Sequence, residues 1–164
     1  MSPVASRARA LRPVIGLFSL FVFLQASSAA VLFALKLGLT PASVELFYLG
    51  DRPRSLGGLL EVAVPHLLAV PLTVFIVAHV VTWAGVGRGP ALVLLTRLSF
   101  ATALIGVGAG FAVRFLWPAL SMLKLAAFLG LEGLLFVWVA MLARASRLGL
   151  PSPRPSPPRG EGGT

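Results

Sequence analysis

Apolar residues along this chain gather into four stretches, each long enough to cross a membrane as a helix. A helical span needs about 20 mostly apolar residues to cross about 30 Å of hydrocarbon. The four stretches cover residues 14–35, 59–83, 91–113 and 120–143. Formal charges lie well inside only two of them, Arg97 in the third and Glu132 in the fourth. The pattern predicts an all-α integral membrane protein built as a four-helix bundle.

The long connection between the first and second spans predicts a short helix of its own. Thr40 followed by Pro41 is typical of an N-cap with proline in the first helical turn, and Gly50 suits its end. Three residues then share an apolar face: Val44, Phe47 and Tyr48. We expect an interfacial helix on the outer membrane surface, anchored by Tyr48; a lid or docking platform over the bundle is the alternative.

Composition excludes a soluble domain. Hydrophobic residues make up 57% and charged residues only 12% of the 164 residues, and the mean hydropathy is +0.94. A soluble fold of this size has no surface for so much apolar area. The chain has no cysteine, which removes disulfides, thiolate zinc sites, iron–sulfur clusters and covalently attached haem.

Basic residues are distributed unevenly between the two sides of the predicted bundle. One side receives the N-terminus, the second connection and the C-terminus, with Arg7, Arg9, Arg12, Arg88, Arg97, Arg144, Arg147, Arg154 and Arg159. The other side has Lys36, Arg52, Arg54, Arg114 and Lys124, partly balanced by Glu45, Asp51 and Glu61. Because cytoplasmic flanks are enriched in Lys and Arg, both termini are predicted to be cytoplasmic. This arrangement and anionic lipid headgroups account for the net charge of +9, so it does not indicate nucleic-acid binding.

The two ends of the chain differ from the membrane domain, residues 14–143. Residues 1–13 form a basic cytoplasmic N-terminus, and residues 144–164 are predicted to be a disordered Pro-rich cytoplasmic tail. The basic start and the segment Gln25–Ala30 also resemble a cleaved signal peptide. The apolar run continues to a full membrane width, which favours an uncleaved first span.

Small residues indicate how the last two spans pack. Gly106 and Gly110 in the third span and Ala126 and Gly130 in the fourth are spaced for close approach of helices. We expect these two helices to touch within one chain, although such pairs also occur in helix dimers.

His66 and His79, the two histidines, both lie in the second span. They are 13 residues apart, which is about 20 Å of rise and roughly 140° of rotation on a straight helix, so they cannot bind one metal ion. Similar pairs are found in b-type cytochromes, where each histidine ligates a different haem. No other helix here has a histidine, which leaves three options for haem b: sharing between two chains, pairing with Met122 or Met141, or five-coordinate iron. The preferred interpretation is structural: His66 hydrogen-bonds to a neighbouring helix, and His79 lies near the cytoplasmic headgroups.

Other polar residues predict a layer near the middle of the bundle. Arg97 and Glu132 are within reach of each other if the third and fourth spans are antiparallel neighbours, and Gln25 and Thr73 lie at similar depth. Such a layer can bind a quinone, relay protons or simply set the register of the helices. Glu61 lies near the outer end of its span. The structural interpretation is favoured, with Arg97 alternatively reaching the cytoplasmic interface.

One part of the chain resembles a known family. The residues concerned are Lys36-x-Gly38-x-Thr40-Pro41, Phe47-Tyr48-Leu49-Gly50, Ser55-x-x-Gly58-Leu59-Leu60-Glu61-Val62, His66, Pro71 and His79. Over Lys36 to His79 they are similar to a family of small four-span bacterial inner-membrane proteins. The resemblance implies a bacterial inner-membrane location but no particular activity. Val64 stands where that family's pattern has a further histidine, which weakens any implied metal or haem site.

Taken together, the residues favour an accessory or structural subunit of a membrane complex, embedded in lipid and not itself an enzyme. No nucleophile–base pair, phosphate loop or metal-ligand cluster is recognisable. Two alternatives stay open. One is a haem-binding electron-transfer subunit using His66 or His79, and the other is a small transporter or proton-conducting protein using Glu132 and Arg97. A homodimer and a larger complex are equally compatible with the sequence.

Overall fold

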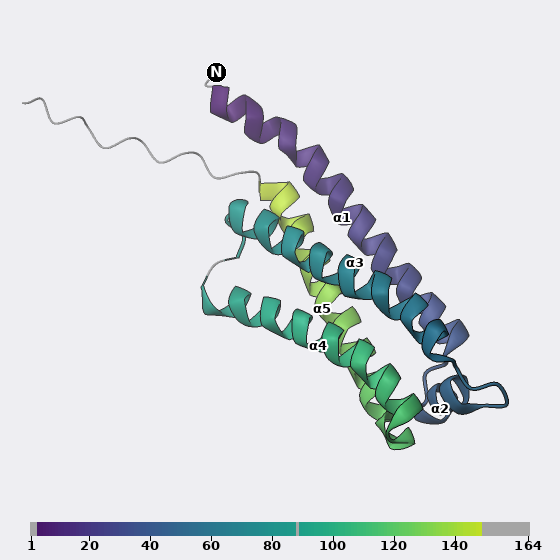
Figure 1. Ribbon diagram of the computed structural model, residues 1–164. Coiled ribbons are helices and arrows are strands. Elements are labelled where there is room, and N and C mark those ends of the chain that lie inside the picture. The colour runs from purple at the N-terminus through teal and green to yellow at the C-terminus, as the bar shows by residue number, and fades with distance from the viewer. Residues whose placement is uncertain (1–2, 88, 149–164) are drawn as a thin grey trace, which may run out of the picture.

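A computed structural model describes residues 3–87 and 89–148, with the side chains of residues 12–87 and 89–147 (Figure 1). The elements in this part of the chain are α1 (Pro3–Lys36), α2 (Pro41–Leu49), α3 (Leu56–Trp83), α4 (Pro90–Phe115), the 3₁₀ turn η1 (Pro118–Leu120) and α5 (Ser121–Leu148). Four segments are long and apolar enough to span a membrane: Arg12–Lys36, Leu56–Trp83, Pro90–Phe115 and Pro118–Arg147. The prediction of an all-α membrane helix bundle is confirmed.

The helices extend further than the predicted spans at both ends of the chain. α1 begins at Pro3 and α5 continues to Leu148, five residues into the predicted tail. The last turns of α5 are ordered by packing, since Leu142 and Ala145 are fully buried. The rest of the predicted tail lies outside the described residues. Pro65 and Pro71 lie inside α3 without ending it.

Helix α5 is the central element of the bundle. It packs against α1, α3 and α4 and contacts α2 and η1 at its N-terminal end, whereas α1 and α3 have little direct contact. α1 and α5 are antiparallel: Ser19 Oγ donates to Val139 O at 3.5 Å, and the rings of Phe33 and Phe128 stack with centroids 3.7 Å apart. The start of α1 and the end of α5 therefore lie at the same end of the molecule, opposite α2 (Figure 1).

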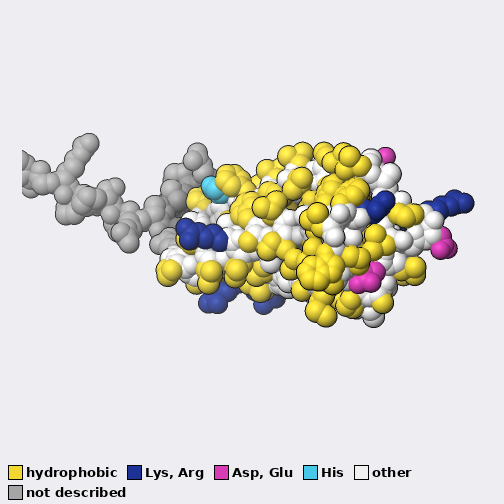
Figure 2. Space-filling view, turned by 60° about the horizontal axis from the view of Figure 1, so that its bottom comes forward, with side chains coloured by type: hydrophobic (Ala, Val, Ile, Leu, Met, Phe, Trp, Pro, Cys, Tyr) yellow, Lys and Arg dark blue, Asp and Glu magenta, His cyan; other side chains and the backbone are white. Residues whose placement is uncertain are grey.

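Charged side chains gather towards the two ends of the molecule, with an apolar band between them (Figure 2). Trp83 and Trp117 are 58% and 65% exposed, and they lie at opposite ends of the bundle, at the end of α3 and just before η1. Exposed tryptophans in this arrangement are typical of the two membrane–water interfaces. The chain is thus a multi-pass membrane protein embedded in a lipid bilayer.

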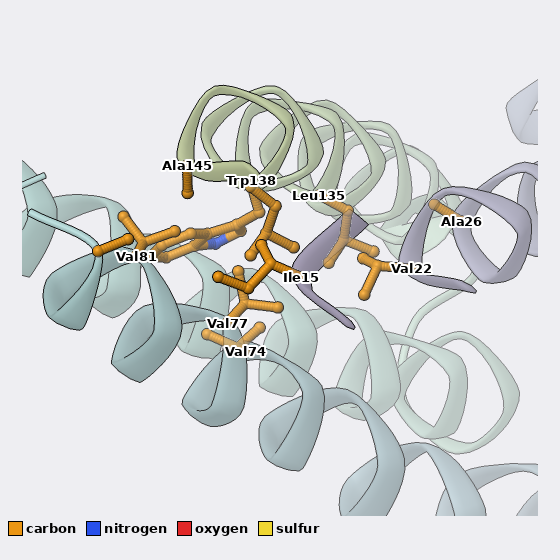
Figure 3. Packing of buried hydrophobic residues seen from close by; sticks show 11 residues of the cluster. Ile15, Val22, Ala26, Val74, Val77, Val81, Leu135, Trp138 and Ala145 are labelled. Carbon is orange, nitrogen blue, oxygen red and sulfur yellow. The ribbon is translucent and has the colours of Figure 1, made fainter. Parts of the chain in front are cut away.

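One apolar cluster fills the half of the bundle where α1 starts and α5 ends. Trp138 of α5 is fully buried there among residues of α1 and α3, including Ile15, Val77 and Val81 (Figure 3). Its indole Nε1 donates to Ser99 Oγ of α4 at 3.0 Å, and Ser99 Oγ donates to Leu95 O at 2.9 Å. This single hydroxyl group satisfies the indole where no water can reach it.

The other half of the bundle is organised around α2. Thr40 is the N-cap: its Oγ1 accepts from Ser43 N at 3.2 Å, and Thr40 N donates to Ser43 Oγ at 3.2 Å, which makes a capping box. Val44 and Tyr48 face inward and are buried with residues of α1, α3 and α4. Ser121 Oγ, at the start of α5, donates to Glu45 Oε1 at 2.8 Å. The prediction of a short helix between the first two spans is confirmed.

Tyr48, however, does not lie at the lipid interface as predicted. It is only 6% exposed, and its ring lies against Gly110 of α4, where an added Cβ would be 2.8 Å from the phenol oxygen. Because Gly110 has no side chain, there is room for the ring of Tyr48 inside the bundle. Tyr48 is a packing residue rather than an interfacial anchor.

The predicted close contact between α4 and α5 is confirmed. A Cβ at Gly106 would be 3.8 Å from Ala127 Cβ, and one at Gly130 would be 3.7 Å from Thr102 Cγ2. Gly106 therefore faces α5, whereas Gly110 receives α2. The glycine pair of α4 is used within this chain.

Candidate functional site

The two histidines lie on the outer surface of α3. Both side chains are exposed, and each Nδ1 lies close to a carbonyl oxygen one turn earlier in the helix, 2.7 Å from Val62 O for His66 and 3.0 Å from Phe75 O for His79. Each Nε2 is thus left for a group outside the helix. A haem on either histidine would therefore be exposed at the surface of the described bundle.

The methionines considered as haem ligands lie in different surroundings. Met122 is 66% exposed, and Met141 packs against the cluster around Trp138. No group of three or more His, Asp or Glu side chains comes together among the residues whose side chains are described.

Glu132 and Arg97 are not brought together. Glu132 is only 7% exposed, and its Oε2 is buried without a hydrogen-bond partner. Phe128, one turn before Glu132, stacks on Phe33 of α1. Leu135, one turn after it, is in the same buried cluster as Val22 of α1. Glu132 therefore lies on the side of α5 that faces α1. Arg97 is exposed on α4. The sequence supports their sharing one depth but cannot give the rotation of each helix.

Gln25 and Thr73 do share one place, a narrow recess between α1 and α3. The recess has a volume of about 10 Å³, and Leu135 of α5 also lines it. Thr73 Oγ1 donates to Ala69 O at 2.8 Å, while the Gln25 side chain is exposed. Glu61 is exposed near the outer end of α3, away from this recess along the chain.

Lys124 is a polar residue whose role the sequence did not reveal. It stands near the start of α5 and is partly buried, and its Nζ donates to Gly106 O of α4 at 2.7 Å. Together with His66 it lines a second cavity, of about 70 Å³, between α3, α4 and α5. The signal in the sequence was the spacing of Lys124 one turn after Ser121, which turns it inward instead of towards the outer surface.

Burial also changes the chemistry of Tyr48, which lies in α2 outside the spans. Loss of solvent raises the pKa of its phenol above the ordinary value, and the nearby positive charge of Arg54 lowers it in part. Arg54 lies over the ring of Phe47 with its guanidinium carbon 4.4 Å from the centroid. Arg54 O accepts from Arg114 Nε at 2.8 Å, which ties this loop to α4.

Comparison with protein families gives a match to a model described as a transmembrane helical domain, over residues 38–147. The match covers more than half of the chain. The chain belongs to this transmembrane helical domain family. The family's domain begins directly after α1 and includes α2, α3, α4 and nearly all of α5. It overlaps the segment whose residues resemble a family of four-span membrane proteins, and its description names a membrane domain without an activity.

Comparisons with curated proteins and with solved structures found no match.

Proposed function

We propose that this protein is an accessory or structural subunit of a bacterial inner-membrane complex, not itself an enzyme, with both termini in the cytoplasm. The observation that carries the proposal is the position of Gln25. Its carboxamide lies on an open face between α1 and α3, near the middle of the membrane.

The depth of Gln25 follows from the helix rise. It precedes Lys36, the end of α1, by 11 residues, or about 16 Å at 1.5 Å per residue. A carboxamide has two donors and an acceptor, and no described residue forms a hydrogen bond with this one. Polar groups facing hydrocarbon without partners are costly, and in membrane proteins they usually meet a neighbouring helix.

The shape of the recess favours a helix as the partner. Its volume of about 10 Å³ is about the space that one water molecule needs, so it is too small for a cofactor. Ala26 beside Gln25 is only 1% exposed and packs inside this chain, so the exposed Gln25 side chain is the polar group that this face presents. A transmembrane helix of another chain, with a polar side chain opposite Gln25, fits this face.

The orientation rests on charge. Arg12, Arg144 and Arg147 lie at the end of the bundle where α1 starts and α5 ends. Over the whole sequence this side receives nine arginines, against five Lys or Arg and three acidic residues on the other side, which supports a cytoplasmic location of this end. A bacterial origin is supported by the resemblance of Lys36 to His79 to bacterial inner-membrane proteins.

Replacement of the carboxamide tests the assembly. Membranes are extracted in a mild detergent, and the size of the particle containing the chain is measured by native electrophoresis and native mass spectrometry. We expect the wild-type chain in a stoichiometric complex and Gln25→Leu shifted towards the monomer, because leucine removes the hydrogen bond and keeps an apolar surface.

Thr82→Val is the matched control. Thr82 is exposed on α3, and its hydroxyl donates only to Ala78 O of its own helix, at 2.7 Å. It is nine residues after Thr73, which places it on the opposite side of α3 from Thr73. A monomeric wild-type chain, or equal losses for both variants, would contradict the proposal.

Haem binding is the first alternative, and the exposed histidines restrict its form. Because both imidazoles are exposed and no other helix has a histidine, a haem here takes its second ligand from another chain or from Met122 or Met141, or its iron is five-coordinate. A reduced-minus-oxidised spectrum of protein expressed with haem available separates the cases. A b-type α-band that is lost in His66→Ala or His79→Ala makes this a redox subunit, and a flat spectrum from folded protein rejects it.

Proton binding at Glu132 is a second candidate function, favoured by its buried Oε2 without a partner. Carboxyl groups at such depth are often sites of proton or ion movement. In proteoliposomes, a proton-conducting role predicts flux that is abolished in Glu132→Gln with helix content unchanged. Arg97→Gln serves as the control, because Arg97 lies on an exposed face of α4. Equal flux in wild type and Glu132→Gln rejects this role.

A further inference from the structure

The cavity beside Lys124 differs from the recess at Gln25: both are lined by α3 and α5, but α4 lines the cavity where α1 lines the recess. It is lined by Leu59, Val62, Ala63 and His66 of α3, Val107, Gly110 and Phe111 of α4, and Lys124 of α5. Its volume is about 70 Å³. Since one water molecule needs about 10–15 Å³ of this kind of space, there is room for several waters or for a small oxyanion.

Lys124 supplies an uncompensated charge to this cavity. Its ammonium group has three donors, and one is used by Gly106 O. No carboxylate forms an ion pair with it among the described residues. Glu45 of α2 accepts from Ser121 Oγ, one turn before Lys124 in α5. An unpaired cation away from water is costly, and an anion would offset that cost.

The direction of the lysine is also informative. Lysines near the end of a span ordinarily extend to the nearby interface. Lys124 Nζ instead donates to Gly106 O of α4. Gly106 lies opposite Ala127, which is one turn deeper on α5 than Lys124, so the lysine does not extend to the interface. Gly106 has no side chain to block this approach. The ammonium group is thus held beside the cavity.

The cavity opens towards lipid and has a second polar wall. Val62 and His66 are exposed on the outer surface of α3, and His66 lies 10 residues, about 15 Å, from the start of that helix. Lys124 follows Trp117, which is exposed at the outer end of the bundle, by seven residues. The site therefore lies in the outer half of the membrane, below the level of the headgroups.

We propose that Lys124 and His66 bind the oxyanion head of an anionic amphiphile that enters from the lipid between α3 and α4. The ammonium group of Lys124 pairs with the oxyanion, and the imidazole of His66 hydrogen-bonds to it from the opposite wall. Two sources supply this chemistry, the phosphate of an acidic phospholipid and the carboxylate of a free fatty acid.

Native mass spectrometry of the full chain tests this site. The protein in mild detergent is titrated separately with phosphatidylglycerol, oleate and zwitterionic phosphatidylcholine. We expect one amphiphile retained per chain, at least tenfold more tightly for phosphatidylglycerol or oleate than for phosphatidylcholine. Tighter phosphatidylglycerol binding identifies a phospholipid ligand, and tighter oleate binding identifies a fatty acid.

Variants locate the binding. Lys124→Gln should weaken it at least tenfold, whereas Lys36→Gln should leave it unchanged, because Lys36 is exposed at the same end of the bundle. Val107→Phe keeps Lys124 but fills the cavity, and it should also abolish binding; it carries the test alone if Lys124→Gln does not fold. Equal retention by wild type and either cavity variant, or no preference over phosphatidylcholine, overturns the proposal. Gln25→Leu should bind normally, so failure of this site and failure of the subunit assembly are distinguishable.

Discussion

Tyr48 is the only tyrosine of the chain, and its environment can be measured directly. Its burial against Gly110 raises the pKa of the phenol, with Arg54 opposing the shift in part. We expect tyrosinate absorbance in detergent to titrate above the ordinary value of about 10, and higher still in Arg54→Gln. A midpoint at the ordinary value would place the phenol in water.

The sign of the pH effect on stability follows from that shift. Because the neutral phenol is favoured in the folded protein, the stabilisation is fully present below the pKa of the unfolded chain, about 10. It is lost as the pH rises through the raised pKa of the folded state. Unfolding at alkaline pH should therefore become easier over that interval.

Ser99 joins α4 to α5 through the indole of Trp138. Ser99→Ala leaves Nε1 without an acceptor in a fully buried place, and we expect a loss of about 1 kcal/mol, the usual value of such bonds between membrane helices. Unfolding in mixed detergent and dodecyl sulfate measures it. Thr96→Val is the control, because Thr96 Oγ1 donates only within its own helix, to Leu92 O. Equal stability of the two variants would show that the bond contributes nothing.

Packing of α2 on α4 depends on a single small residue. Gly110→Ala would put a Cβ within 2.8 Å of Tyr48 Oη, and we expect a loss of about 1–3 kcal/mol, as for overpacking in general. Gly108→Ala, two residues away, is the control, because no atom lies within 4 Å of the added Cβ. Since alanine is a better helix former than glycine, the free energy of unfolding of this variant should be unchanged or higher by up to about 1 kcal/mol.

The same denaturation series reports both glycine variants, and the Tyr48 titration adds a second readout. Displacement of the ring should return its pKa towards 10 in Gly110→Ala. If Gly110→Ala and Gly108→Ala unfold alike, the contact between Tyr48 and α4 is not formed.

Sequence alone predicts the elements well because their signals are local. Span length is set by membrane thickness, and the start of α2 is set by Thr40 and Pro41. Contacts between elements are not local. Tyr48 is buried because Gly110, sixty-two residues later, leaves room for it, and Arg97 misses Glu132 because packing of Trp138 and Gly130 on α4 turns Glu132 towards α1. The direction of Lys124 likewise depends on Gly106.

The whole bundle is organised by α5, which leaves two lateral faces with different polar groups. Gln25 lies between α1 and α3, and Lys124 and His66 lie between α3 and α4. The start of α1 and the end of α5 lie at one end of the bundle, and α2 lies at the other (Figure 1).

The absence of cysteine makes the orientation straightforward to test. Single cysteines are introduced at exposed positions at opposite ends, as Arg52→Cys and Arg147→Cys. An impermeant maleimide should label Arg52→Cys in intact spheroplasts and Arg147→Cys only after permeabilisation. The reverse pattern would place both chain ends outside.

Photo-crosslinking in native membranes determines whether the face around Gln25 receives a helix of another chain. A photoreactive residue is introduced at position 25 and, as the control, at position 104, where Leu104 is 65% exposed on α4. We expect one discrete crosslinked protein from position 25, identifiable by mass spectrometry, and only lipid adducts from position 104. Lipid adducts alone from position 25 would contradict the presence of such a helix.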